Sequence, residues 1–476
     1  MAGLTTCALV AETGSPPTAG QRTNTTVRVS ANQVLGQFDN PAWYQNQSGP
    51  NSPLGPRDRD LVDALDVKVA RVWLLPSGYY NPATHRYDFD FAGSEGTSTY
   101  RYLDQVAGYA QRLMVNLGEC VPDILTLDDP RECRRVLHDG LAAYKRRYPS
   151  IRYVELFNEP DKTWDVPEGH WQGLTVDDYY AWYRIGYSVV EDINRDLHPR
   201  IPLRIGGPAT ASFDEDFLRG FLDRYAHDSD PDKRLGFISY HQYQHAADPA
   251  AVGTEKRTVR DWLDGRGLDP DTPVFVTEYG VFPGEARGRS SGEDLLVQAA
   301  AMQTLAYYYL NSGMDAAMHW VFRHPSNERK SMFTGADGRV HPYFNLVRMQ
   351  RRMKSRRVAA TSDGLSPAGL GVNVLATADS SGVAVLTTNY QWTTGRATHD
   401  VSMDVDLPAQ LAHQRLRLDR YLVDSTTSND AHDPASSDLQ RVERRTLTAG
   451  ATVHTTFRLK PNALSLVVLT PMSALQ

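Results

Sequence analysis

The sequence predicts an α/β fold, a (β/α)8 TIM barrel with a C-terminal antiparallel β-sandwich. Three observations lead to this prediction. The chain has 476 residues, enough for a barrel of about 250 residues and a smaller domain. Short apolar runs alternate with helical patterns up to about residue 355. Beyond that point, short runs of alternating polarity separated by polar loops take over, as in a sandwich.

The predicted barrel strands are eight short apolar runs. Their continuous apolarity indicates parallel strands buried on both faces, because strands with one solvent-exposed face alternate between apolar and polar residues. Helical patterns separate the runs, and in one of them Asp177 is the predicted cap of a helix that ends near Leu197, before Pro199. The runs comprise residues 34–38, 69–75, 112–117, 153–157, 203–207, 236–241, 274–278 and 316–321.

The two ends of the chain complete the predicted organisation. Residues 1–26 are rich in Thr, Gly, Ala and Pro without periodicity, which is typical of a flexible tail. We assign residues 27–355 to the barrel domain and residues 356–476 to the sandwich. The segment 27–33 precedes the first barrel run, so it can instead supply a strand to the sandwich.

Charge and hydropathy exclude two classes of partner. The net charge is −7 and no long basic run occurs, whereas nucleic-acid-binding proteins usually carry a basic patch. No apolar stretch approaches the roughly 18 residues of a membrane span. We therefore expect neither nucleic acid nor membrane as a partner, and the sequence carries no signal for oligomeric state.

Cysteine usage and the N-terminus leave the compartment open. The three cysteines, Cys7, Cys120 and Cys133, match neither a disulfide framework nor a zinc motif, although Cys120 and Cys133 can pair if the protein is exported. The N-terminus lacks the basic and apolar regions of an intact signal peptide, but Leu4–Cys7 resembles the end of a lipoprotein signal. The cytoplasm is the default prediction, and export or a clipped lipoprotein is the alternative.

Two glutamates follow predicted barrel strands, at the barrel face where enzymes of this fold place their active sites. Glu159 lies in the sequence Asn158-Glu-Pro160 after the fourth strand, and Glu278 begins the sequence Glu-Tyr-Gly after the seventh. Glycoside hydrolysis needs two carboxyl groups in one cleft: one protonates the leaving oxygen, and the other attacks the anomeric carbon or activates water. A lone glutamate would be interpreted as a surface carboxylate, but this pair favours a glycosidase site.

The sequence around these glutamates resembles a known group of enzymes. FNEP at residues 157–160, together with VTEYG at residues 276–280, resembles clan A of the glycoside hydrolases. More narrowly, the order of elements resembles glycoside hydrolase family 39, the family of β-xylosidases and α-L-iduronidases. Leu117-Gly118, Gly206-Gly-Pro208 and the C-terminal sandwich fit this family. The resemblance covers residues 34–350 well and the rest of the chain loosely.

The resemblance assigns roles to three residues. It implies that Glu159 is the general acid/base and Glu278 the nucleophile. It also implies hydrolysis with retention, for which the two carboxyl groups stand about 5–5.5 Å apart. Asn158 is expected to hydrogen-bond the 2-hydroxyl of the sugar, a contact that strengthens in the transition state. Alternatively, Asn158 stabilises its own turn.

Two residues after the sixth strand extend the predicted site. His241-Gln-Tyr243 resembles the His-x-Tyr sequence of clan A. Its tyrosine can donate a hydrogen bond to the nucleophile and keep it oriented and ionised. His241 is expected to line the cleft, unless it is a core histidine bonded to the backbone.

Arg71 and Trp320 complete the predicted site. An inward arginine in a barrel strand requires a carboxylate partner, and we expect Arg71 to pair with Glu278 and keep it ionised. A more desolvated Glu159 is expected to stay protonated. Trp320, at the eighth strand, is placed to form a floor beneath the sugar ring, or else packs in the barrel.

No metal or cofactor is predicted. His241 and His245 have the spacing of a helical metal site but fall on a strand and a loop. Residues 228–232 imitate the start of a calcium loop, but Lys233 stands where that loop requires glycine. The sequence contains neither a phosphate-binding glycine loop nor a Gly-x-Ser-x-Gly elbow.

The leading functional hypothesis is a retaining, exo-acting, β-xylosidase-like glycosidase acting on a carbohydrate or glycoside. One alternative is a retaining endo-glycanase of the same clan. Another is a uronide-specific enzyme, since Arg323 and His324 can hold a carboxylate, although they can equally form a surface loop. A third is a barrel that binds carbohydrate without catalysis, which the presence of both carboxylates disfavours.

Overall fold

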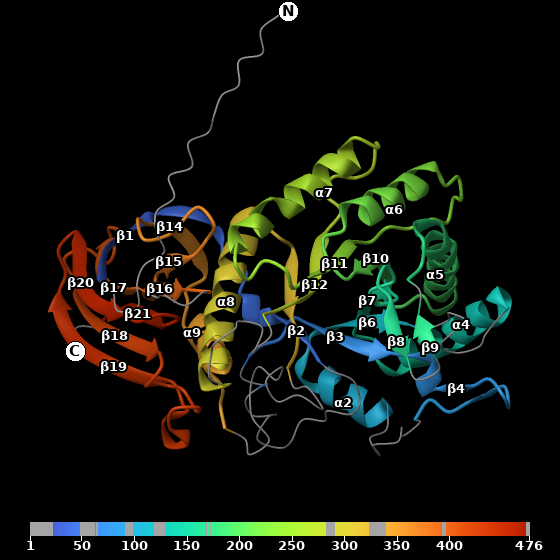
Figure 1. Cartoon of the computed structure of the whole chain (residues 1–476), viewed down its shortest axis with the longest axis horizontal. Coiled ribbons are helices and arrows are strands. Elements are labelled where there is room, and N and C mark those ends of the chain that lie inside the picture. The colour runs from blue at the N-terminus through green and yellow to red at the C-terminus, as the bar shows by residue number, and fades with distance from the viewer. Residues whose placement is uncertain are drawn as a thin grey trace, which may run out of the picture.

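The chain folds into a closed barrel of eight parallel strands and a second sheet of nine strands beside it (Figure 1). The computed structural model describes residues 22–47, 62, 65–90, 99–118, 129–166, 169–171, 173–281, 291–322, 339–392 and 397–472. The second sheet is antiparallel except for one parallel pair, β1 and β17. The predicted TIM barrel with a β-sandwich is therefore confirmed.

The barrel strands follow one another around the ring in sequence order, and the last pairs with the first. All their pairings are parallel, so their C-terminal ends meet at one face of the barrel. The strands are β2 (Tyr44–Asn46), β3 (Val69–Leu74), β6 (Arg112–Leu117), β7 (Ile151–Leu156), β10 (Arg204–Thr210), β11 (Ile238–Gln242), β12 (Val274–Tyr279) and β13 (Ala316–His319).

The prediction that residues 34–38 form the first barrel strand is wrong. Residues 34–37 end the long strand β1 (Arg22–Gln37), which pairs with β14 and β17 of the second sheet. The segment 27–33 lies in the same strand. β1 also begins inside the predicted tail, so residues 22–26 are part of a sheet.

β2 takes the first place in the barrel, and its sequence explains why it escaped prediction. It has only three residues, and two of them, Gln45 and Asn46, are polar. Both side chains are nevertheless fully buried. Gln45 donates a hydrogen bond to the Ala42 carbonyl, and Asn46 donates one to the Thr277 carbonyl in β12. Hydrogen bonds to the backbone thus replace the apolar run that marks the other barrel strands.

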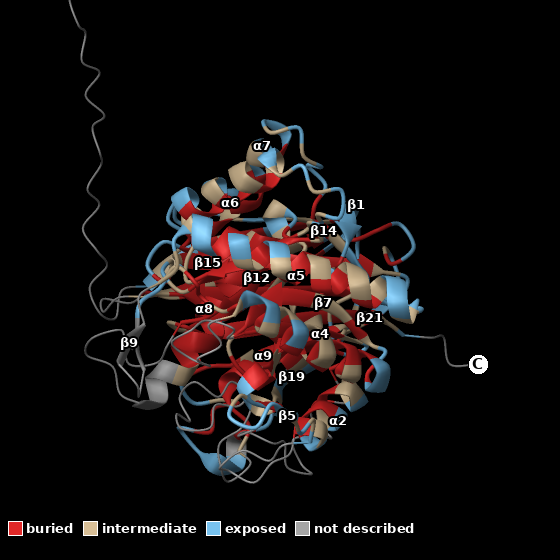
Figure 2. Cartoon of the chain, turned by 90° about the vertical axis from the view of Figure 1, so that its right-hand side faces the viewer, coloured by how far each residue is buried: buried red, intermediate tan, exposed pale blue. Residues whose placement is uncertain are grey.

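Helices surround the barrel and turn their polar faces outward. Figure 2 shows barrel strands such as β7 and β12 buried, whereas the outer faces of α5, α6 and α7 are exposed. The helices are α2 (Thr99–Tyr109), α4 (Pro130–Arg147), α5 (Val176–Leu197), α6 (Glu215–His227), α7 (Glu255–Asp264), α8 (Ser291–Ser312) and α9 (Pro342–Gln350). Two small hairpins, β4 (Tyr80–Asn81) with β5 (Arg86–Tyr87) and β8 (Trp164–Val166) with β9 (Gly169–Trp171), lie outside the barrel.

The predicted helix from Asp177 to Leu197 is present as α5 with a different cap. Thr175 is the N-cap, and its hydroxyl accepts a hydrogen bond from the Asp178 amide. A threonine cap satisfies an amide that has no partner within the helix. The helix ends at Leu197, and His198 then turns into the left-handed region, before Pro199.

The second sheet folds over on itself around its own apolar core. Strands from the middle and from both halves of the sheet, including β1, β17, β18 and β21, contribute side chains to one cluster. The strands that follow the barrel are β14 (Arg356–Ser362), β15 (Gly371–Asp379), β16 (Gly382–Tyr390), β17 (Thr398–Asp406), β18 (Arg415–Val423), β19 (Gln440–Thr448), β20 (Thr452–Leu459) and β21 (Leu464–Pro471).

α8 lies between the barrel and the second sheet, against β15 and β16 (Figure 1). Every residue of β16 is buried, because one face of the strand meets the sandwich core and the other meets the barrel domain. Leu386 and Leu466 from the second sheet belong to the same apolar cluster as the barrel helices. The two domains therefore share a continuous core.

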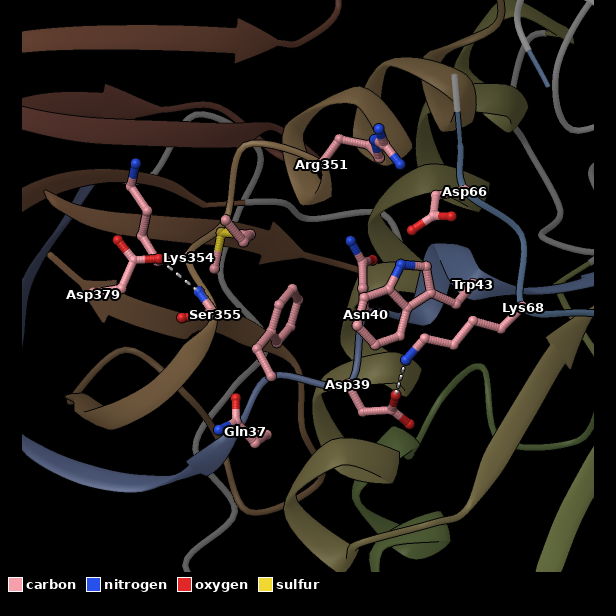
Figure 3. Close-up of a pocket in the computed structure, with 12 residues that line it drawn as sticks. Gln37, Asp39, Asn40, Trp43, Asp66, Lys68, Arg351, Lys354, Ser355 and Asp379 are labelled. Atoms are coloured by element: carbon pink, nitrogen blue, oxygen red, sulfur yellow. Dashed lines mark hydrogen bonds and ion pairs between the residues drawn. The ribbon is translucent and has the colours of Figure 1, made fainter. Parts of the chain in front are cut away.

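A pocket of about 570 Å³ opens between the two domains at the N-terminal ends of β2 and β3 (Figure 3). Its lining includes charged residues of both signs. The Lys68 ammonium lies 3.7 Å from an Asp39 carboxylate oxygen and 3.0 Å from the centroid of the Trp43 ring. Asp379 accepts hydrogen bonds from the Ser355 and Ser381 amides. Among the described residues, no helix is long and apolar enough to cross a membrane.

Glu255 is a buried carboxyl group that makes stability depend on pH. It begins α7 and accepts hydrogen bonds of 2.7 Å from the Tyr240 hydroxyl and the Gln242 amide. Burial raises its pKa from 4.5 to about 7, and the hydrogen bonds offset only part of this shift. Because the folded-state pKa is raised, its contribution to stability is complete below pH 4.5 and is lost as pH rises through 7.

We expect wild type to lose about 3 kcal/mol of unfolding free energy relative to Glu255→Gln between about pH 4.5 and pH 8.5. Urea denaturation of both proteins across this range measures the difference, and the contributions of other groups cancel. A difference that does not change with pH would contradict the prediction.

Candidate active site

A fully buried arginine organises the C-terminal face of the barrel. Arg71 in β3 has no exposed surface. Its Nε donates a hydrogen bond to Glu155 Oε2 at 2.7 Å, and its Nη1 donates to Glu278 Oε1 at 2.7 Å. Its Nη2 donates to Asn158 Oδ1 at 2.9 Å. One guanidinium thus joins strands β3, β7 and β12 and the loop after β7.

Glu278 is held at both carboxylate oxygens. The Tyr243 hydroxyl donates to Oε2 at 2.7 Å, while Arg71 holds Oε1. Glu278 is only 5% exposed, so little water competes with these partners. Burial, and then the charge of Glu278, raises the pKa of Tyr243 well above its ordinary value, so the phenol remains a donor. Both oxygens of the carboxylate are therefore fixed in orientation.

Glu159 faces a different set of partners. Its Oε1 lies 3.0 Å from His241 Nδ1, and its Oε2 accepts a hydrogen bond from the Lys162 ammonium at 3.2 Å. Burial raises the pKa of Glu159, but the hydrogen bond and charge of His241, and then Lys162, outweigh burial and leave this pKa below its ordinary value. The expectation that burial keeps Glu159 protonated is therefore wrong in this structure.

His241 lies between the two glutamates and is fully buried. Its Nδ1 is 3.0 Å from Glu159 Oε1 and 3.7 Å from Glu278 Oε2. Burial lowers its pKa, but the charge of Glu278 and the hydrogen bond to Glu159 outweigh burial and raise it. The lowered pKa of Glu159 and the raised pKa of His241 both favour the proton on the imidazole.

The backbone at the end of β7 is strained where it presents the site. Phe157 and Glu159 adopt positive φ angles of 64° and 47°, which are unfavourable for residues other than glycine. The Glu159 amide donates a hydrogen bond to the Ala209 carbonyl at 2.9 Å, which fixes the turn. This conformation brings Asn158 to Arg71 and Glu159 to His241.

Two buried residues of this network were missed by the sequence analysis. Glu155 is fully buried in β7, and Asn116 in β6 donates hydrogen bonds to Glu155 Oε2 at 3.1 Å and to the Phe157 carbonyl at 2.7 Å. Burial raises the pKa of Glu155, but the charge of Arg71 outweighs it and leaves the pKa below its ordinary value. A signal was available, since a glutamate inside an apolar barrel strand requires a cationic partner just as Arg71 requires an anionic one.

Trp320 lies beside the network together with a second tryptophan. Its partly exposed ring packs edge-to-face on Trp73, with the ring centroids 6.2 Å apart. The Arg71 guanidinium is 5.1 Å from the centroid of the Trp73 ring. Trp73 was missed, although it follows Arg71 by two residues and so points to the same face of β3.

The glutamates and His241 also have the geometry of metal ligands. One ligand atom from each of Glu159, His241 and Glu278 lies within 4.8 Å of the other two. However, both carboxylates already have cationic partners, Arg71 and Lys162, which repel a divalent ion.

Some predicted features lie outside the described residues. They include Arg323 and His324, offered as partners for a uronic carboxylate, and Cys120. Cys133, its predicted partner, is buried in α4.

Solved structures share this fold. A monomeric β-xylosidase from Caulobacter crescentus is 16% identical, with a TM-score of 0.72 over 94% of this chain and 100% of that one. A GH39 enzyme from Xanthomonas axonopodis pv. citri is 15% identical, with a TM-score of 0.67 over 95% and 98%. A bacterial orthologue of human α-L-iduronidase is 15% identical, with a TM-score of 0.70 over 96% and 85%.

No protein-family model and no curated protein sequence matches the chain. The likeness to solved structures therefore establishes the fold. That fold is shared with solved glycosidases, which include a GH39 enzyme, as the resemblance predicts.

Removing Arg71 would leave Glu155 buried without its cation. We expect Arg71→Met to lower the free energy of unfolding by about 3–5 kcal/mol, because breaking a buried ion pair costs more than the pair itself contributes. Urea denaturation measures this loss. Arg28→Met, at an exposed position of β1, is the matched control and should change the free energy by less than about 0.5 kcal/mol. Equal losses in the two variants would contradict the prediction.

Proposed function

We propose that this chain is a retaining glycoside hydrolase that removes a terminal sugar, with Glu278 as the nucleophile and Glu159 as the general acid/base. One observation carries the proposal: a carboxylate oxygen of Glu159 lies within 4.8 Å of one of Glu278. Retaining glycosidases hold their carboxyl groups about 5–5.5 Å apart, whereas inverting ones need roughly 6.5–9.5 Å to admit a water molecule. The short distance supports retention.

The first step forms a covalent glycosyl-enzyme. Arg71 and Tyr243 hold and orient Glu278, so a carboxylate oxygen can attack the anomeric carbon. The glycosidic bond breaks, and the leaving oxygen takes a proton from Glu159. His241 is hydrogen-bonded to Glu159 and holds the proton of the pair, so it can return that proton to the carboxylate as substrate excludes water.

The second step reverses the first with water in place of the leaving group. Glu159, now ionised, accepts a proton from water, and the resulting hydroxide oxygen attacks the anomeric carbon and displaces Glu278. Asn158 precedes Glu159, accepts a hydrogen bond from Arg71 and is suited to contact the sugar 2-hydroxyl. Trp320 and Trp73 supply partly exposed aromatic faces for the apolar side of the ring.

The substrate we propose is a β-xyloside or a related glycoside, in line with the β-xylosidase and GH39 structures that share the fold. A uronide is the second candidate. It is favoured by the likeness to an iduronidase orthologue and by Lys162, a half-exposed cation 3.2 Å from Glu159 that can pair with an anionic substrate group.

Chromophore release from a panel of aryl glycosides tests the proposal. We expect turnover of one class among β-xyloside, α-L-arabinoside, β-glucoside, β-galactoside, α-L-iduronide and β-glucuronide. Glu278→Gln should lower kcat by about 10⁴-fold or more, because it removes the attacking carboxylate. Proton NMR of the first-formed sugar should show the anomeric configuration of the substrate.

Glu159→Gln provides an internal check on the two roles. A good leaving group needs no proton, so an activated aryl glycoside should still form the covalent intermediate in this variant and release its chromophore in a burst. Azide should then restore turnover and give a glycosyl azide of retained configuration. First-formed sugar of inverted configuration, or full activity in Glu278→Gln, would refute the mechanism.

Lys162 should set the basic limb of the pH profile. Its charge lowers the pKa of Glu159, so Lys162→Met should raise that pKa and move the basic limb of kcat/KM to higher pH. Lys162→Arg keeps the charge and is the control, with its limb unmoved. A limb that stays in place or moves to lower pH in Lys162→Met would contradict this prediction.

A further inference from the structure

A pocket at the opposite end of the barrel from the two glutamates has a cationic lining. It has a volume of about 870 Å³ and lies where β6 and β7 begin and where α4 and α5 end. The described residues that line it include no Asp or Glu. The cations and the histidine in its wall are Arg112, Lys145, Arg146, Arg152, His198 and Arg200.

The cations of this pocket have no acidic partners within the described part of the chain. None of the five Lys and Arg side chains forms a salt bridge there, although most other surface arginines of the barrel do. Arg112 donates a hydrogen bond only to the neighbouring Gln111 carbonyl. The Nε of Arg152 is buried and has no hydrogen-bond partner. A buried donor without a partner is costly, so this arginine is not fully satisfied by the described residues.

Lys145 shows how crowded the positive charges are. Its side chain is almost completely buried, and its ammonium donates hydrogen bonds to the Pro149 carbonyl at 2.8 Å and to the Ile151 carbonyl. Burial, and then repulsion from Arg112, lowers the pKa of Lys145 to about 8. This pKa is only slightly above neutral pH, and a bound anion would raise it by offsetting the positive charge of Arg112.

Helix ends explain only part of this cluster. Cations in the last turn of a helix interact favourably with its dipole, which accounts for Lys145 and Arg146 at the end of α4. Arg112 is instead the first residue of β6 and Arg152 the second residue of β7, and Arg200 lies in the loop after α5. These three arginines collect on one pocket in a chain whose net charge is −7.

The pocket between the two domains in Figure 3 provides a contrast. It also contains charged residues, but there Lys68 pairs with Asp39, and Asp379 accepts hydrogen bonds from nearby amides. The interdomain pocket thus contains charges of both signs and an ion pair, whereas the described lining of the cationic pocket contains cations without any carboxylate.

We propose that the cationic pocket binds a small ligand carrying phosphate or sulfate groups. Guanidinium groups match such oxyanions through paired N–H donors, and several of them around one cavity suit a ligand with more than one negative charge. The volume is in the usual range for a small-molecule site. The site is separate from the carboxylate cluster, so this inference does not depend on the hydrolase activity.

Calorimetric titration with pyrophosphate at low salt tests the proposal. Wild type should bind, and Arg152→Gln and Arg200→Gln should each weaken binding by about tenfold or more, since each removes a charge-assisted contact. Arg28→Gln makes the same change of charge at an exposed position of β1 and should bind as wild type does. Arg200 lies in an exposed loop, so its variant keeps the test valid if Arg152→Gln does not fold.

Two further measurements locate the binding. Affinity should fall as pH rises through 8, where Lys145 loses its charge, and should fall when salt screens the cations. Glu278→Gln, at the other end of the barrel, should bind pyrophosphate unchanged. Titration with sulfate in place of pyrophosphate decides whether the pocket prefers sulfate or phosphate groups. Undetectable binding of both anions, or equal affinity in the wild-type, Arg152→Gln and Arg200→Gln proteins, would overturn the proposal.

Discussion

The burial of one guanidinium is the constraint on which the rest of the site depends. Moving an arginine out of water costs several kcal/mol, and only well-placed anionic acceptors offset that cost. Arg71 obtains them from Glu155 on a neighbouring region of the barrel and from Glu278 across it, with Asn158 as a neutral third acceptor. Each acceptor belongs to an element that must be in register for the bond to form. The arginine therefore couples barrel closure to the geometry of the site.

This constraint also divides the two glutamates into different electrostatic environments. Glu278 is paired with the Arg71 guanidinium and accepts a hydrogen bond from the Tyr243 hydroxyl, and neither partner changes protonation near neutral pH. Glu159 instead meets His241, a group that can gain and lose a proton. One carboxylate is thus paired with a permanent cation, and the other is paired with a group that can exchange a proton. Such a pair, with environments that set the two groups apart, is what acid/base and nucleophilic roles require.

The second sheet packs against the barrel domain through one continuous apolar core that contains residues of both domains. α8 is buried between the barrel and β16, and leucines from β16 and β21 join the barrel cluster. The long strand β1 begins the described part of the chain in the second sheet, and a short 3-10 helix (Pro41–Trp43) connects it to the first barrel strand, β2. The first strand (β1) and the last strand (β21) of the described chain therefore belong to the same sheet, one before and one after the barrel in the sequence. Closure of the barrel is thereby coupled to folding of the sandwich.

The local sequence pattern was sufficient to predict a strand wherever the strand's own apolar residues account for its burial. Apolar runs predicted all but the first of the barrel strands, and the alternating runs predicted the second sheet. β1 and β2 were misassigned because their burial comes from distant partners. Val34 and Leu35 are exposed although apolar, and Gln45 and Asn46 are buried although polar.

The sequence by itself determined the fold class and most of the residues at the C-terminal face of the barrel, because strand ends in this fold converge whatever the loops do. The partners of those residues were decided by tertiary structure alone. Whether Glu159 holds a proton depends on its distances to His241 and Lys162, and the role of Glu155 depends on its distance to Arg71. Electrostatic energy is set by separation and burial, and neither quantity is written in the order of residues along the chain.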